Sequence, residues 1–200
     1  MARTTASARS AASARTAITT RIGGVFNGGF EIGTGSATTG WIGAEAYGWR
    51  VNDTTGTASF DSTTSHSGSQ SLKAVKSASA GTFSINNIND SDLTTLPVHG
   101  TKVIPSTSYT LTCWYKTDGV TGPRIQCHGY TASAWVETYF NTVLSTPTDW
   151  TLFTATFTTG ASVVNLAIVP GRYNDGEGAN GTVSNFDDIN LQLTSRSVIA

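Results

Sequence analysis

The chain has few charged residues, few cysteines and no long apolar run. Charged side chains make up 12% of its 200 residues, and Cys113 and Cys127 are the only cysteines. Two cysteines do not make a disulfide scaffold. In a cytoplasm we expect them to be small buried hydrophobic side chains. Because no apolar run reaches ~18 residues, we expect no membrane-spanning helix. No apolar stripe persists at helical spacing, which argues against a helical domain.

Charge is unevenly distributed along the chain. The net charge is −1, but the first 22 residues contain four arginines and no acidic residue, so the remainder carries −5. Such a body offers no basic face to phosphate groups, and we expect no nucleic-acid binding. The N-terminus also lacks the apolar stretch of a secretory signal, so we expect synthesis in a cytoplasm.

Threonine, serine and glycine are abundant instead, with 34 Thr, 22 Ser and 21 Gly. Threonine and other β-branched or aromatic residues suit strands, whereas Gly, Asn and Asp form turns. Short segments separated by turn signals predict an all-β sandwich or barrel of about eight to ten antiparallel strands. The expected strands lie within residues 23–33, 39–52, 58–77, 81–88, 108–119, 123–134, 135–145, 149–160, 162–170 and 182–193.

Several short motifs occur in a characteristic order. They are "NGGFE" (27–31), Trp41, "HSGSQSLKA" (66–74), "SYTLTCWYKTDG" (108–119), "DWTLFTATFTT" (149–159) and "NFDDINLQL" (185–193). In this order and spacing the chain resembles the jelly-roll carbohydrate-binding modules of the family 4/9/22 type, within the galactose-binding-like superfamily. The resemblance implies a jelly-roll β-sandwich over residues 23–194, preceded by an arm of residues 1–22 and followed by a tail of residues 195–200.

The resemblance also implies a structural calcium ion. Many such modules hold one between the opening strand, the "HSGS" turn and the last strand. Calcium takes about six to eight oxygen ligands, and the candidates are the carboxylates of Glu31 and Asp187 or Asp188 with carbonyl groups of the Ser67–Ser69 turn. The alternative is that these carboxylates cap turns and accept backbone N–H groups.

Alternation along residues 109–116, 124–130 and 164–168 separates an apolar inward face from a polar outward face. An aromatic ring can cover the C–H face of a sugar, and amide, imidazole and guanidinium groups can hydrogen-bond its hydroxyls. We therefore predict a glycan site on the outward face, unless Trp114 packs beneath a loop and the polar residues only face water. The predicted glycan-binding residues are Trp114, Arg124, Gln126, His128, Tyr130 and Asn165. A weaker candidate site is formed by the loop aromatics Trp41, Tyr47, Trp49 and Tyr173, of which core packing explains one or two equally well.

The sequence contains no recognisable catalytic motif. Glycoside hydrolysis needs two carboxylates flanking a bond, and the acidic residues here are thinly scattered. Nucleophile-elbow, phosphate-loop and metalloprotease motifs are missing, and His66, His99 and His128 lack metal-site spacing. We expect no enzymatic activity.

Arginine recurs every six residues in the arm, at Arg3, Arg9, Arg15 and Arg21. An extended strand would place all four on one face, whereas a helix would set successive arginines ~120° apart. The segment resembles the N-terminal attachment segments of some phage fibre and decoration proteins. Ordering the arm costs roughly 1–2 kcal/mol of backbone entropy per residue, and its small side chains bury too little apolar area to offset that cost within one chain. We therefore expect a homo-oligomer, first of all a trimer, or docking on other virion proteins. The alternative is a disordered linker.

Three functions are consistent with these features. The first is a non-catalytic structural or adhesive subunit of a phage-type virion, whose jelly roll attaches to a host glycan. The second is a free or cell-surface glycan-binding module related to the accessory domains of glycoside hydrolases. The third is a decoration protein without a ligand. The first function places the protein in the virion, and the second places it outside the cell or at its surface.

Overall fold

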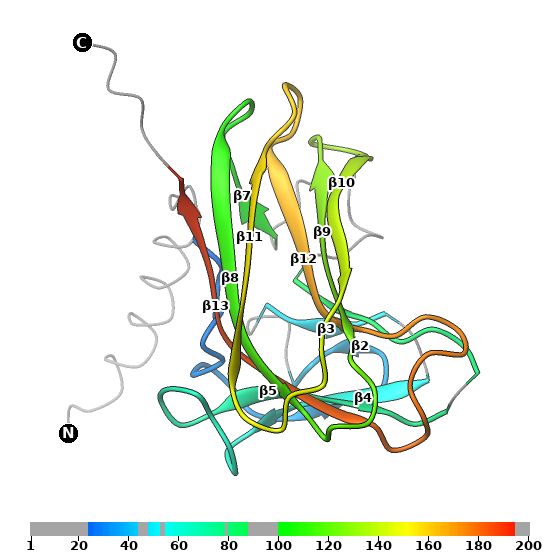
Figure 1. The fold of residues 1–200 in the computed structure, drawn as a ribbon. Helices are drawn as coiled ribbons and strands as arrows, with labels where there is room; N and C mark the ends of the chain where they lie inside the picture. Colours follow the sequence, from blue (N-terminus) through cyan, green and yellow to red (C-terminus); the bar gives the residue numbers. More distant parts are fainter. Residues whose placement is uncertain (1–23, 44–47, 53–54, 79, 88–99, 195–200) are drawn as a thin grey trace, which may run out of the picture.

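The computed structural model describes residues 24–43, 48–52, 55–78, 80–87 and 100–194. Within these ranges every strand pair is antiparallel, and the strands form a β-sandwich (Figure 1). The predicted all-β class, a sandwich of antiparallel strands, is therefore confirmed. No helix long and apolar enough to cross a membrane occurs in the part of the chain that is described. The arm with its four arginines and the C-terminal tail lie outside the described residues.

The larger sheet has six strands, and its long strands β13, β8 and β11 run side by side in Figure 1. Strand β8 alternates strictly, because Tyr109, Leu111 and Cys113 are fully buried while the residues between them are only partly covered. This is the predicted inward set. The strand order is β1 (Ser36–Ala37), β4 (Gly56–Asp61), β5 (Ser71–Lys76), β13 (Val183–Leu193), β8 (Ser108–Thr117) and β11 (Thr151–Thr158).

The second sheet has four strands and faces the larger sheet across the core. Ile125, Cys127, Leu166 and Ile168 are fully buried and belong to one hydrophobic cluster with the inward residues of β8. Val164, also predicted to point inward, instead lies just before its strand and is exposed. The strand order is β10 (Trp135–Val143), β9 (Arg124–Tyr130), β12 (Asn165–Arg172) and β7 (Thr101–Lys102).

A small third sheet is attached to β12. It consists of β2 (Gly40–Trp41), β3 (Arg50–Val51) and β6 (Ile85–Asn86). Phe83 and Tyr173 exchange two backbone hydrogen bonds, of 2.9 and 2.8 Å. The side-chain oxygen of Asn87 accepts the N–H of Ile168 at 2.9 Å. These bonds fix the small sheet beside β12, where it overhangs one face of the four-stranded sheet.

A bulge near the end of β12 changes the direction of its last side chain. The register with β9 shifts between Val169 and Arg172, and Gly171 has a φ of +72°. A side chain at this position would be strained by that φ, and its Cβ would lie 2.9 Å from the ring of Phe186. Strict alternation would place Arg172 on the core side with Ile168. The bulge instead brings it to the outer face with Val169.

Candidate functional site

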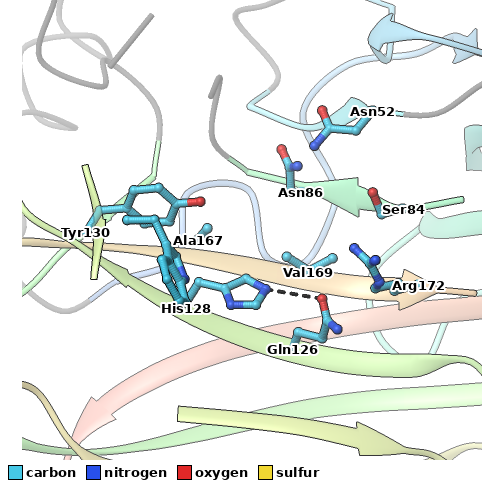
Figure 2. Close-up of a pocket in the computed structure, with 10 residues that line it drawn as sticks. Asn52, Ser84, Asn86, Gln126, His128, Tyr130, Ala167, Val169 and Arg172 are labelled. Carbon is cyan, nitrogen blue, oxygen red and sulfur yellow. Dashed lines mark hydrogen bonds between the residues drawn. The ribbon is translucent and has the colours of Figure 1, made fainter. Parts of the chain in front are cut away.

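A pocket of about 190 Å³ lies on the outer face of the four-stranded sheet (Figure 2). Its floor comes from alternate residues of the central strands β9 and β12, and the small sheet supplies the opposite wall. Tyr130 lies at one end and Arg172 at the other. The lining residues are Gln126, His128, Tyr130 and Trp135 from β9 and β10, Ala167, Val169 and Arg172 from β12, and Asn52, Ser84 and Asn86 from the small sheet and its flanks.

Two aromatic side chains stand at one end of the pocket. Tyr130 and Trp135 are direct cross-strand partners in the β9–β10 pairing, so both point to the same face. Tyr130 is buried against Ala167, whereas the Trp135 side chain is 57% exposed. An exposed ring beside a buried one offers an apolar plane of the kind that stacks on a sugar.

A chain of hydrogen bonds orients the polar floor. Nδ1 of His128 lies 2.8 Å from the Thr138 hydroxyl, and Nε2 of His128 lies 3.1 Å from Oε1 of Gln126. Because an amide oxygen only accepts, Nε2 carries a hydrogen and donates it to Gln126, and in the neutral ring Nδ1 then accepts from the Thr138 hydroxyl. The amide nitrogen of Gln126 remains as a donor toward the pocket.

Two arginines lie opposite one another where β9 begins and β12 ends, beside the turn of residues 174–177. Arg124 and Arg172 are cross-strand partners. Nε of Arg124 donates to both carboxylate oxygens of Glu177 at 2.9 Å, and the guanidinium lowers the pKa of Glu177 to about 2. Nε of Arg172 instead donates to the neutral amide oxygen of Asn174 at 2.9 Å. The Glu177 carboxylate is thus bound by Arg124 and not by Arg172.

The structure brings three of the six predicted glycan-binding residues together in the pocket, namely Gln126, His128 and Tyr130. Arg124 belongs to the same strand but does not line the pocket, because it is held by Glu177. Asn165 shares the face of Tyr130 through the β12–β9 register. It is buried outside the pocket lining, with both side-chain polar atoms unpaired.

The prediction that Trp114 shares this face is wrong. Its strand, β8, lies in the six-stranded sheet between β13 and β11, so its outward side is the opposite face of the sandwich. There the Trp114 ring stacks on His66 at a centroid distance of 3.9 Å, and Trp150 meets His66 edge-on at 5.9 Å. Trp114 packs beneath the loop around residue 66, as the alternative interpretation proposed.

The weaker set of loop aromatics is divided by the structure. Trp49 and Tyr173 are fully buried in the core, which is the packing that the sequence left open. Trp41 lies under the guanidinium of Arg50, 5.9 Å from its ring centroid. Tyr47 lies outside the described residues. Of the three that the structure describes, Trp41, Trp49 and Tyr173, none lines the pocket.

Seven described lining residues were not among the predicted glycan-binding residues, namely Asn52, Ser84, Asn86, Trp135, Ala167, Val169 and Arg172. Among these residues, only Trp135 could have been identified from the sequence, because a hairpin with a short loop at residues 131–134 sets it opposite Tyr130. The small-sheet residues reach the pocket through tertiary contacts of β12, and Arg172 reaches it through the bulge.

The predicted calcium ligands gather around the turn of residues 65–70. Asp187 is fully buried, and its carboxylate accepts the N–H groups of His66, Ser67 and Asp188 at 2.7–3.2 Å. Burial raises the pKa of Asp187. Asp188 pairs with Nδ1 of His66 at 2.7 Å and accepts the Ser67 hydroxyl at 2.8 Å.

Glu31 is engaged in the same way. It accepts the N–H and the hydroxyl of Ser69 at 2.9 and 2.7 Å, and the N–H of Gln70 at 3.1 Å. Hydrogen bonds from Ser69 lower the pKa of Glu31. The turn therefore offers N–H and O–H donors to these carboxylates, and such donors do not fit the oxygen cage of calcium. In the described part of the chain, no group of three His, Cys, Asp or Glu side chains is arranged to hold a metal. This arrangement favours the alternative, in which the carboxylates cap the turn, and calcium binding itself is untested.

The fold is similar to that of solved glycan-binding modules. The N-terminal cellulose-binding domain of Cellulomonas fimi β-1,4-glucanase C is 16% identical, with a TM-score of 0.52 over 80% of this chain and 95% of that domain. The CBM22-1 xylan-binding domain of Paenibacillus barcinonensis Xyn10C is 10% identical, with a TM-score of 0.52 over 88% of this chain and 99% of that domain.

A larger enzyme also contains a similar domain. An arabinose-bound GH51 α-L-arabinofuranosidase is 16% identical, with a TM-score of 0.59 over 84% of this chain, but the match spans only 26% of the enzyme. No family model and no curated protein matches the sequence. This chain thus has the jelly-roll fold of carbohydrate-binding modules.

Proposed function

We propose that this protein is a non-catalytic glycan-binding module whose site is the pocket on the outer face of the four-stranded sheet. The observation that carries the proposal is the cross-strand pair Tyr130–Trp135 next to the hydrogen-bonding groups of Gln126 and His128. The rings provide an apolar plane, and the fixed amide and imidazole provide directed hydrogen bonds, which together suit a sugar.

The lining residues support binding without hydrolysis. None of the described residues around the pocket is Asp or Glu, whereas glycoside hydrolysis uses a pair of carboxylates flanking the bond. The similar structures are named as cellulose-binding and xylan-binding domains, which supports a glycan as the ligand class here.

The glycan-binding module is favoured over the virion subunit that the arm suggested. The Arg-periodic arm lies outside the described residues, and the similar structures named above are glycan-binding domains or a glycoside hydrolase. The resemblance of the arm to phage attachment segments stays a prediction, as do the trimer and the virion location.

Binding to a panel of neutral and acidic polysaccharides, measured by affinity electrophoresis and calorimetry, tests the proposal. We expect the intact protein to bind at least one glycan, and Trp135→Ala to weaken that binding by about ten-fold or more while leaving the fold intact. The matched control is Val143→Ala, because Val143 is similarly exposed at the far end of the same strand. Failure of the folded protein to bind any glycan would contradict the proposal.

A further inference from the structure

The pocket contains a cationic group without a carboxylate partner. Arg172 donates Nε to the Asn174 amide, and its two terminal nitrogens make no hydrogen bond or ion pair in the described structure. In Figure 2 its guanidinium group stands above β12, on the side of the pocket where Ser84 lies. The side chain is therefore held at its base, with its outer edge open toward the pocket.

The neighbouring residues leave this charge uncompensated. Arg124, directly across from Arg172 in the register, takes the Glu177 carboxylate through Nε and Nη2. Like charges placed directly opposite across two strands are destabilising. One carboxylate for two guanidinium groups leaves an excess of one positive charge, and a bound anion would offset it.

The surroundings of Arg172 strengthen its interaction with an anion. The described lining of the pocket contains no acidic side chain that would repel an anion, and the adjacent floor is formed by Ala167 and Val169, which are both buried. A charge pair beside an apolar, half-enclosed floor is screened less than a pair in open water.

The shape of the free edge limits the chemistry of the anion. Since Nε is occupied by Asn174, the remaining donors are the two terminal nitrogens, whose parallel N–H groups match two oxygens of one oxyanion. The aromatic pair lies at the opposite end, and from Tyr130 to Gln126 alone β9 rises by ~13 Å. The pocket is therefore long enough for more than one sugar ring between the aromatic end and the arginine.

From these observations we infer that the module selects an acidic glycan. A sugar stacks at Tyr130 and Trp135, and an oxyanion on the same chain, a uronate carboxylate or a sulfate ester, binds the terminal nitrogens of Arg172. The inference rests on the proposed glycan-binding function and adds the class of glycan. Both sources of the anion share the chemistry of two oxygens presented to one guanidinium.

Matched pairs of polysaccharides test the inference. Polygalacturonate is compared with its carboxyl-reduced form, and a sulfated galactan with its desulfated form, using calorimetry at low and high salt. We expect one acidic member to bind about ten-fold or more tightly than its neutral match, with the difference shrinking as salt rises. A difference within the polygalacturonate pair identifies a carboxylate as the anion, and a difference within the galactan pair identifies a sulfate ester.

Two variants assign the effect to Arg172. Arg172→Gln should remove the preference for the acidic member, and Arg172→Lys should restore only part of it, because an ammonium lacks the fork of donors. Lys73→Gln removes one positive charge from the other sheet and should change nothing. In the part of the chain that is described, the Lys73 ammonium is paired with Asp61 alone, at 3.8 Å.

The other outcomes overturn the inference and are distinguishable from failure of the proposed function. Equal binding of acidic and neutral members, lost in Trp135→Ala, would leave a glycan-binding module without acidic selectivity. A preference for the acidic member that survives in Arg172→Gln would place the anion elsewhere. No binding to any member or to any neutral glycan would reject the proposed function together with the inference.

Discussion

Glu177 determines which of two facing arginines carries an unbalanced charge. Its carboxylate is bonded to Arg124 and also accepts the N–H of Asn174 at 2.9 Å. The same Asn174 holds Arg172 through its side chain. Glu177 thus neutralises Arg124. It also holds Asn174, which in turn orients Arg172.

Replacing Glu177 by Gln should lower stability in a pH-dependent way. The hydrogen bonds from Arg124 hold the pKa of Glu177 at about 2, below its ordinary value of 4.5. A depressed carboxylate pKa stabilises the folded state above that ordinary value, and the stabilisation is lost as the pH falls through about 2. We expect Glu177→Gln to cost about 1 kcal/mol at neutral pH, because the pair is only partly buried, and to cost nothing at the acidic limit.

Urea unfolding of both proteins between neutral and strongly acidic pH measures this difference. Asp149→Asn serves as the control, since Asp149 is an exposed carboxylate in a loop. A deficit in Glu177→Gln that is equally large at the acidic limit would mean that the loss comes from packing and not from charge.

At the scale of strands, β8 and β9 carry outward aromatic and polar residues on opposite faces of the sandwich. Trp114 of β8 holds His66, and Lys116 of the same strand donates to the Thr64 hydroxyl at 2.9 Å while lying 5.4 Å from the Trp150 ring centroid. These contacts tie the loop of residues 62–70 to the six-stranded sheet. The outward residues of β9 line the pocket instead.

Trp114→Ala should therefore change the stability of the fold, whereas Trp135→Ala should change glycan affinity. We expect Trp114→Ala to destabilise the fold by roughly 1–3 kcal/mol, through loss of the His66 stack, and to leave glycan affinity unchanged. Trp135→Ala should leave stability nearly unchanged, because that ring is mostly exposed, and should weaken binding. Denaturant unfolding and calorimetry on the same preparations separate the two. Loss of binding in a folded Trp114→Ala protein would move the glycan site to the six-stranded sheet.

The sequence was informative where alternation was regular and uninformative where a strand changed register or sheet. Tyr109, Leu111 and Cys113 follow period two without interruption, so their inward direction was predicted. Separating Trp114 from the row of Gln126 required knowing that β8 and β9 belong to different sheets, and alternation within a strand carries no such information. Arg172 was missed because the bulge at Gly171 reverses its face, and the small sheet reaches the pocket only through long-range contacts with β12.

At the scale of the whole molecule, the network around Asp187 connects the opening segment, the turn of residues 65–70 and the last strand. These regions are distant in sequence, so a group that joins them contributes to global stability. The described donors already satisfy the carboxylates of Glu31 and Asp187. On this geometry, melting of the intact protein should be the same in excess calcium as after exhaustive chelation.

Differential scanning calorimetry with and without chelator, together with elemental analysis of the purified protein, measures this. Magnesium in place of calcium controls for ionic strength. A ligand bound only by the folded state raises the melting temperature, so a rise that calcium produces and magnesium does not would establish the ion. It would also require Glu31 and Asp187 to turn away from the N–H groups that they accept.

The position of Trp135 gives the protein an intrinsic optical probe. The chain has five tryptophans; Trp49 is fully buried, whereas Trp135 is 57% exposed at the mouth of the pocket. Trp41, Trp114 and Trp150 are partly covered. An aqueous quencher such as iodide will therefore reach Trp135 most readily, and a sugar stacked on that ring will shield it. Occupancy of the pocket can be followed by fluorescence in unlabelled protein, even for polysaccharides too heterogeneous for crystals.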